Sequence, residues 1–155
     1  MFGEGRPILR LAWFEGVVVS LGAISGIVWT AESPSVPQEP TTLTLPVSAS
    51  SFAWLVAFAH VAWLGWHIHT RQPKSLAFIV WVLLVACMLI WRPLFCAEST
   101  IWLSAATQMF APILTALLLP LVAAIDTAAG WSCLPLLLWL GYRAVLILLL
   151  LAALI

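Results

Sequence analysis

The side chains of this chain that could carry chemistry are few, and its three histidines all lie in one stretch. His60 and His67 are seven residues apart, which on a helix separates them by about 10 Å along the axis. That distance is too large for both to hold one iron from opposite sides. His60 alone could still be an axial haem ligand, so a haem-binding membrane anchor is one hypothesis. A hydrogen-bonded histidine within the membrane is the other interpretation.

Motifs of hydrolytic or nucleotide-dependent enzymes are absent from the sequence. It holds no GxSxG, no HExxH and no Walker loop. The single aspartate, Asp126, has no histidine near it in the sequence. We therefore expect a binding protein without a catalytic group and without a required cofactor.

The composition is that of a membrane protein. Hydrophobic residues make up 64% of the 155 positions and charged residues only 8%, and the mean hydropathy is +1.13. A soluble domain of this size needs far more charge to cover its surface. Six basic residues balance six acidic ones, so nothing indicates binding to nucleic acid.

Apolar stretches long enough to cross a bilayer occur five times. They predict an all-α, five-helix transmembrane bundle in a single domain over residues 1–155, with helices at 11–29, 52–68, 76–94, 101–125 and 129–150. A segment rich in Pro, Ser and Thr, 30–51, is expected to be an irregular loop. The other connections are short, so neighbouring helices should be antiparallel. The first stretch could instead be a cleaved signal peptide, but Glu15 interrupts its apolar core.

Basic residues near the spans indicate the orientation. Four lie on the amino-terminal side and one lies opposite: Arg6, Arg10, Arg71 and Lys74 against Arg92. This bias predicts a cytoplasmic amino terminus, and we expect the membrane to be that of a bacterial cell. Arg143 is expected to extend toward the outer face, where it meets headgroups, Glu98 or Glu32.

Ten tryptophans give nearly every span a large flat ring. Such rings suit the lipid interface, but they also suit the walls of a pocket for a flat hydrophobic ligand. Aromatic residues, with some other large apolar ones, recur at helical spacing in three of the spans. The second span has Trp54 and Phe58. The third has Trp81, Met88, Trp91 and Phe95, and the fifth has Trp131, Pro135 and Tyr142 with Trp139 beside them. Three aromatic faces in one small bundle favour a shared pocket.

Small and polar residues form two further patterns. Gly22 and Gly26 make a GxxxG, which we interpret as close packing within the bundle rather than as a dimer interface. Ser104, Gln108 and Thr115 share one face of the fourth span. This face should point inward, because polar side chains in a membrane avoid lipid.

The carboxy-terminal half contains motifs that resemble a known family. WRPLFC at 91–96, AGW at 129–131 and LPLLLW at 134–139 resemble stretches that end the third helix and open the fifth helix of the TspO family. Trp54, Phe58, Ala62 and Trp66 resemble its second-helix pattern. These proteins are also called tryptophan-rich sensory proteins, translocator proteins or peripheral benzodiazepine receptors. The resemblance covers about residues 50–148 and identifies the chain as a divergent member.

The resemblance implies a function. It predicts binding, and transport or sensing, of flat hydrophobic ligands in a Trp-lined cavity, with porphyrins or other tetrapyrroles first and sterol-like lipids second. Membrane lipid and a second copy in a homodimer are the implied partners. The implied ligand-binding residues are Trp54, Phe58, Trp66, Met88, Trp91, Phe95, Pro135, Trp139 and Tyr142.

The chain departs from the family where relatives carry polar groups. Leu84 and Met88 replace a Gln and an Asn of the third helix, and Leu136 and Ile147 replace a Tyr and an Asn of the fifth. The groups that would orient a ligand are thus apolar here. The alternative function is a structural or assembly subunit whose tryptophans pack against partner membrane proteins.

Overall fold

The computed structural model describes residues 5–30, 47–96 and 101–153, with side chains described within 12–24, 49–91, 93–94 and 102–152. The described residues form six helices and no strand. In chain order they are α1 (Gly5–Thr30), α2 (Val47–Arg71), α3 (Leu76–Cys96), α4 (Ile101–Ala123), α5 (Thr127–Trp131) and α6 (Cys133–Ala153).

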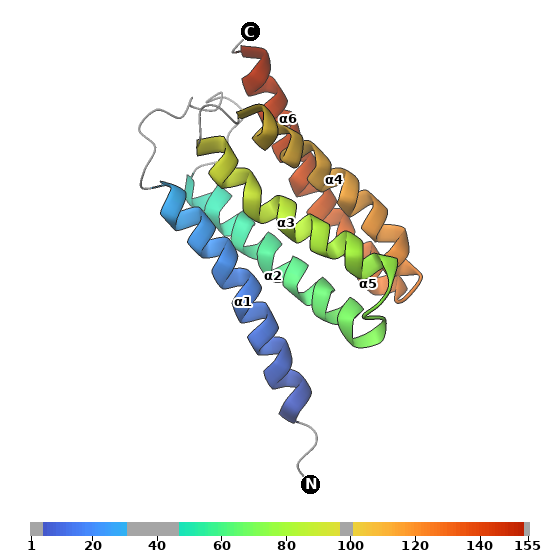
Figure 1. Cartoon of the computed structure of the whole chain (residues 1–155). Helices are drawn as coiled ribbons and strands as arrows, with labels where there is room; N and C mark the ends of the chain where they lie inside the picture. Colours follow the sequence, from blue (N-terminus) through green and yellow to red (C-terminus); the bar gives the residue numbers. More distant parts are fainter. Residues whose placement is uncertain (1–4, 31–46, 97–100, 154–155) are drawn as a thin grey trace.

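The long helices run up and down beside one another (Figure 1). The amino terminus of α1, the α2–α3 connection and the α4–α5 connection lie at one end, and the last turn of α6 lies at the other. α3 packs most closely on α4 and α4 on α6, while α1 packs on α2 and α3. The backbones of α2 and α6 approach each other closely at few points. Side chains must therefore fill the space between these two helices.

Several helices begin or end away from their expected boundaries. α1 begins at Gly5, not at residue 11. α2 begins at Val47, not at residue 52, so residues 47–51 are helical instead of belonging to the loop. It also continues to Arg71, because hydrogen bonding extends through polar residues that an apolar count leaves out. The remainder of the expected loop, 31–46, lies outside the described residues.

The predicted helix at 129–150 is divided into α5 and α6. Pro135 has no N–H, and its ring conflicts with the carbonyl of Trp131, four residues earlier. α5 accordingly ends at Trp131, and α6 begins at Cys133. Ser132 between them keeps helical torsions of φ −64° and ψ −17°, so the interruption is a local one.

The core lies between α2, α3, α4 and α6. Leu64, Leu84, Leu118 and Leu140, one from each of these helices, are almost fully buried. The polar face of α4 is also inside, with Ser104, Gln108 and Thr115 buried. Its expected inward orientation is confirmed. The Ser104 hydroxyl donates to the Trp91 carbonyl at 3.0 Å, and the Thr115 hydroxyl donates to the Ala111 carbonyl at 2.9 Å.

Two glycines allow aromatic rings to lie directly on a neighbouring backbone. A Cβ at Gly22 would come within 2.6 Å of the Phe58 ring, so the start of the GxxxG is occupied by intramolecular packing of α1 on α2. A Cβ at Gly65 would overlap the indole of Trp81. That indole is fixed, because its Nε1 donates to the Val61 carbonyl at 2.7 Å.

Three stretches among the described residues are long and apolar enough to cross a membrane: Ala49–Arg71, Trp102–Ala123 and Thr127–Ala152. Ala12–Ile24 and Leu76–Trp91 are shorter apolar helices. Their outward side chains are large and apolar, including Val17, Ile79 and Leu138. This is the surface expected of a protein embedded in lipid.

Replacing Gly65 by Ala should destabilise the bundle by about 1–3 kcal/mol, because the new methyl group displaces a hydrogen-bonded, buried indole. Gly141→Ala is the matched control, since no atom lies within 4 Å of its added Cβ. That change should be neutral or stabilise by up to about 1 kcal/mol through helix propensity. Thermal unfolding in detergent measures both, and equal shifts would contradict the role given to Gly65.

Candidate functional site

An apolar groove lies between α2 and α6. Its volume is about 350 Å³, and it is lined by Phe52, Ala53, Val56, Ala57 and His60 from α2 and by Pro135, Leu136 and Trp139 from α6. Apolar pockets of a few hundred Å³ with few polar groups are typical of small-molecule sites. The groove follows from the wide separation of the two backbones. It is open at the side, where Val56 is 52% exposed.

A cluster of aromatic rings adjoins this groove through Trp139, the one ring of the cluster that is among the lining residues. Trp54 of α2 stacks on Trp91 of α3, with ring centroids 5.5 Å apart and planes at 19°. It meets Trp139 of α6 edge to face at 5.8 Å and 81°. Phe58 lies 5.9 Å from Trp54, and Tyr142 lies 5.7 Å from Trp139. Rings from three helices therefore converge on one interior region and pack against one another.

Some of the predicted site residues lie close to one another, and others lie elsewhere in the bundle. Five of them form the aromatic cluster (Trp54, Phe58, Trp91, Trp139 and Tyr142), and Pro135 lines the adjoining groove. Met88 is buried in the core of α3. The side chain of Phe95 lies outside the described residues. That any of them binds a ligand stays a prediction.

Trp66 belongs to a different aromatic group. Its ring lies 6.3 Å from Phe14 of α1, and Phe14 stacks on Trp81 of α3 at 5.5 Å. Trp81 in turn stacks on Phe78 at 5.4 Å. Trp66 thus helps to pack α1 against α2 and α3, and it does not line the groove.

Arg143 lies against the aromatic cluster. Its Cζ atom is 5.6 Å from the centroid of the Trp91 ring, a cation–π distance. The sequence predicted that it extends toward headgroups, Glu98 or Glu32, and both glutamates lie outside the described residues. The electron-rich face of the indole stabilises the charge of the arginine in a region close to lipid.

Two nitrogen atoms of groove-lining side chains have no hydrogen-bond partner among the described residues. They are Nε2 of His60 and Nε1 of Trp139, and both atoms are buried. The imidazole of His60 stacks on Trp63 at 5.6 Å, and the backbone of Ser132 lies beside it. The imidazole of His60 has a hydrogen bond with the backbone of Ser132, as the interpretation of a hydrogen-bonded histidine predicts, while its Nε2 has no partner among the described residues.

Little in the sequence indicates the α2 side of this groove. Its apolar lining residues on α2 are of types that occur throughout the spans, so nothing in the sequence distinguishes them: Phe52, Ala53, Val56 and Ala57. On this helix, His60 is the lining residue for which the sequence suggests a role, as a haem ligand or as a hydrogen-bonded histidine. A usable signal was the spacing of 53, 56, 57 and 60, which places these residues on one helical face.

A polar cluster joins the end of α2 to the α4–α5 connection. Asp126 accepts from Arg71 Nη1 at 2.7 Å, and its Oδ2 lies 3.4 Å from His67 Nε2. Its Oδ1 also caps α5 by accepting from the N–H groups of Ala128 and Ala129. These contacts lower the pKa of Asp126, the Ala129 N–H first and the Arg71 guanidinium next. The fold thus supplies the histidine that is missing near Asp126 in the sequence.

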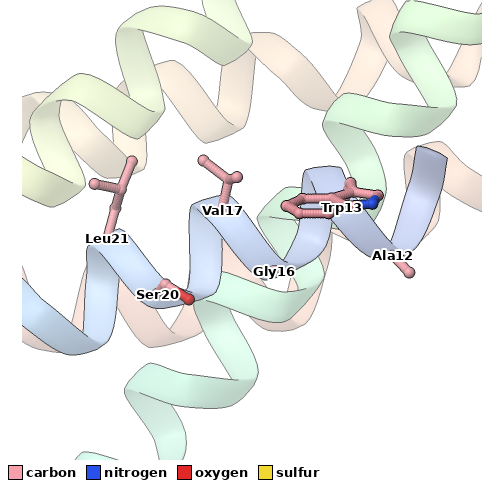
Figure 2. A pocket seen from close by; sticks show the side chains of 6 residues that line it. All are labelled: Ala12, Trp13, Gly16, Val17, Ser20 and Leu21. Carbon is pink, nitrogen blue, oxygen red and sulfur yellow. The ribbon is translucent and has the colours of Figure 1, made fainter. Parts of the chain in front are cut away.

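A second hollow, of about 510 Å³, lies on α1 alone. Figure 2 shows its lining side chains, with Trp13, Val17 and Leu21 in a row along the helix and Ser20 beside them. All of its lining residues that the structure describes belong to α1. We assign this hollow to the outer surface of the bundle.

These features define an integral membrane protein built of helices, with an aromatic cluster and an apolar groove between them. The sequence matches the model of the TspO/MBR family over residues 16–151. Because the match covers nearly the whole chain, the protein belongs to the TspO/MBR family. The match extends the resemblance seen at 50–148 across most of α1. A comparison with curated proteins finds no match.

Asp126→Asn should remove part of the pH dependence of stability. The pKa of Asp126 is lowered in the folded protein, so its contribution is full above the ordinary value of about 3.9. It is lost as the pH falls below that value. Asparagine still caps a helix but offers Arg71 no charge. Thermal midpoints from about pH 6 to about pH 3 should therefore converge for the two proteins at the acidic end. A constant difference would contradict the ion pair.

Proposed function

We propose that this protein binds a flat hydrophobic molecule in the α2–α6 groove, with a porphyrin or other tetrapyrrole first and a sterol-like lipid second. The observation that carries the proposal is the convergence of Trp54, Trp91 and Trp139 beside an apolar groove. Membership of the TspO/MBR family supports it.

Binding follows from burial of apolar surface against a fixed wall. Trp139 lines the groove, and its contact with Trp54 holds it in place. Pro135 and Phe52 add apolar surface on either side. The groove of about 350 Å³ is open at the side, so a macrocycle can insert one edge while the remainder stays in lipid. We propose a receptor or carrier, since no described group of the groove is arranged for bond cleavage.

We also propose five membrane crossings, with α5 and α6 counting as one. The α2–α3 connection, which carries Arg71 and Lys74, lies at the same end as the amino terminus of α1 (Figure 1). The positive-inside rule then places that end in the cytoplasm. The cluster around Asp126 belongs to the same end.

Protoporphyrin IX should quench the tryptophan fluorescence of the detergent-solubilised protein saturably. Trp139→Ala should weaken binding by roughly tenfold, because one aromatic wall is lost. Val56→Trp should weaken it too by filling the groove from a position that is already half exposed. Trp102→Ala is the matched control, since Trp102 lies on α4 and is 62% exposed. Unsaturable quenching, or equal binding by all four proteins, would rule out the site.

The second candidate is a haem-binding anchor. The observation in its favour is that His60 lines the groove and that its Nε2 has no hydrogen-bond partner among the described residues. A neutral imidazole nitrogen is a common iron ligand. Haem added to the protein should then give a Soret band of a His-ligated iron, and His60→Ala should abolish it. His69→Ala is the control, since His69 is exposed and does not line the groove. An unchanged spectrum in His60→Ala would rule this candidate out.

A further inference from the structure

The groove between α2 and α6 changes in exposure from its edge to its back. At the edge, Phe52 and Val56 are 67% and 52% exposed. At the back, Ala57 and Leu136 are only 5% and 3% exposed, and all four side chains line the groove. A ligand that enters from the side therefore passes two exposed side chains and then reaches a part of the groove that apolar atoms enclose.

The lining supplies no cation of permanent charge. None of the lining residues that the structure describes is Lys, Arg, Asp or Glu. Arg71 is paired with Asp126 at 2.7 Å, and Arg143 lies over the ring of Trp91. Neither arginine lines the groove.

A carboxylate at the back of the groove is therefore strongly unfavourable. Removing an ionised carboxylate from water is costly unless a cation or several hydrogen-bond donors replace the water. The side chains of Ala57 and Leu136 offer neither. The one described lining residue that can titrate, His60, has a hydrogen bond with the backbone of Ser132. Hydrocarbon, in contrast, gains free energy in proportion to the apolar area that it buries there.

The two ends of the groove lie at different depths along α2. Phe52 is about 8 Å along the helix axis from Val47, where the helix begins, and His60 is about 20 Å from it. In a bilayer that α2 spans, the Phe52 end is thus nearer to the membrane surface. A charged group at that end keeps its access to headgroups and water.

We propose that the groove binds its ligand by an uncharged hydrocarbon edge, which lies against Ala57 and Leu136, while any ionised group of the ligand remains outside at the Phe52 end. The inference rests on the proposed function. It adds the orientation of the ligand and the class of ligand that is excluded, namely flat molecules with ionised groups on opposite edges. Protoporphyrin IX meets the requirement, because its two propionates share one edge of the ring.

Three pyrene probes separate the effect of charge from that of size. Pyrene-2-carboxylate is ionised at one end of the ring, and pyrene-2,7-dicarboxylate is ionised at both ends. Pyrene-2,7-dicarboxamide is as long as the dicarboxylate but has no charge. Binding to the detergent-solubilised protein at neutral pH is followed by saturable quenching of tryptophan fluorescence, and protoporphyrin IX is measured alongside. Each Kd is corrected for the partition of the probe into protein-free micelles.

The monocarboxylate and the dicarboxamide should both bind, and the dicarboxylate should bind more weakly than either by roughly tenfold or more. Ala57→Leu should weaken binding of the monocarboxylate by roughly tenfold, because the larger side chain fills the back of the groove. Ala59→Leu is the matched control and should leave that Kd unchanged, since Ala59 lies on the same helix, is exposed and does not line the groove. Thermal unfolding shows whether each variant is folded.

Three results would overturn the inference while protoporphyrin IX still binds. Equal binding of the monocarboxylate and the dicarboxylate would show that charge on the inner edge carries no cost. Weak binding of both two-ended probes would show that length decides. An unchanged Kd in folded Ala57→Leu would show that the ligand does not reach the back of the groove. The probe comparison in the wild type is decisive even where that variant fails to fold. Saturable binding of neither protoporphyrin IX nor any probe would instead overturn the proposed function.

Discussion

The contact of Trp54 with Trp91 and Trp139 joins three helices whose backbones do not all meet. α2 and α6 are held apart at most levels, and the indole of Trp54 bridges them by stacking on α3 and meeting α6 edge to face. Without these rings the space between the two helices would be a void. Lipid would then fill it, or the helices would move together and close it. The groove exists because the rings fill one part of this separation and leave the outer part open.

The ends of the same helices are fixed by polar contacts. Asp126 ties α2 to the α4–α5 connection through Arg71, and it also caps α5. At the same end, Gly65 lets Trp81 lie on α2. α2 is therefore anchored near its carboxyl end, and its amino-terminal half borders the groove. This arrangement places the polar anchor of α2 away from the part of the helix that lines the candidate site.

Much of this could be predicted from sequence, and the rest depends on distances that sequence does not contain. Apolar length and helical spacing indicated the helices, the inward face of α4 and the shared location of Trp54, Trp91 and Trp139. Trp66 lies apart from the groove, because residues 54 and 66 share a helix but lie at different depths. The Arg71–Asp126 pair joins residues 55 positions apart, and no local pattern marks it. That His60 Nε2 and Trp139 Nε1 have no hydrogen-bond partner among the described residues can be established only from the positions of the groups around them.

The sideways opening of the groove bears on how the proposed ligand would arrive. Phe52 and Val56 at its edge are more than half exposed on a helix long enough to span the bilayer. With this helix in a bilayer the entrance would face acyl chains, and the proposed ligand would exchange by diffusion within the plane of the membrane. A molecule that dissolves in lipid is already concentrated there, so weak intrinsic contacts suffice for high occupancy. The amount of bilayer, not the aqueous volume, then sets the working concentration.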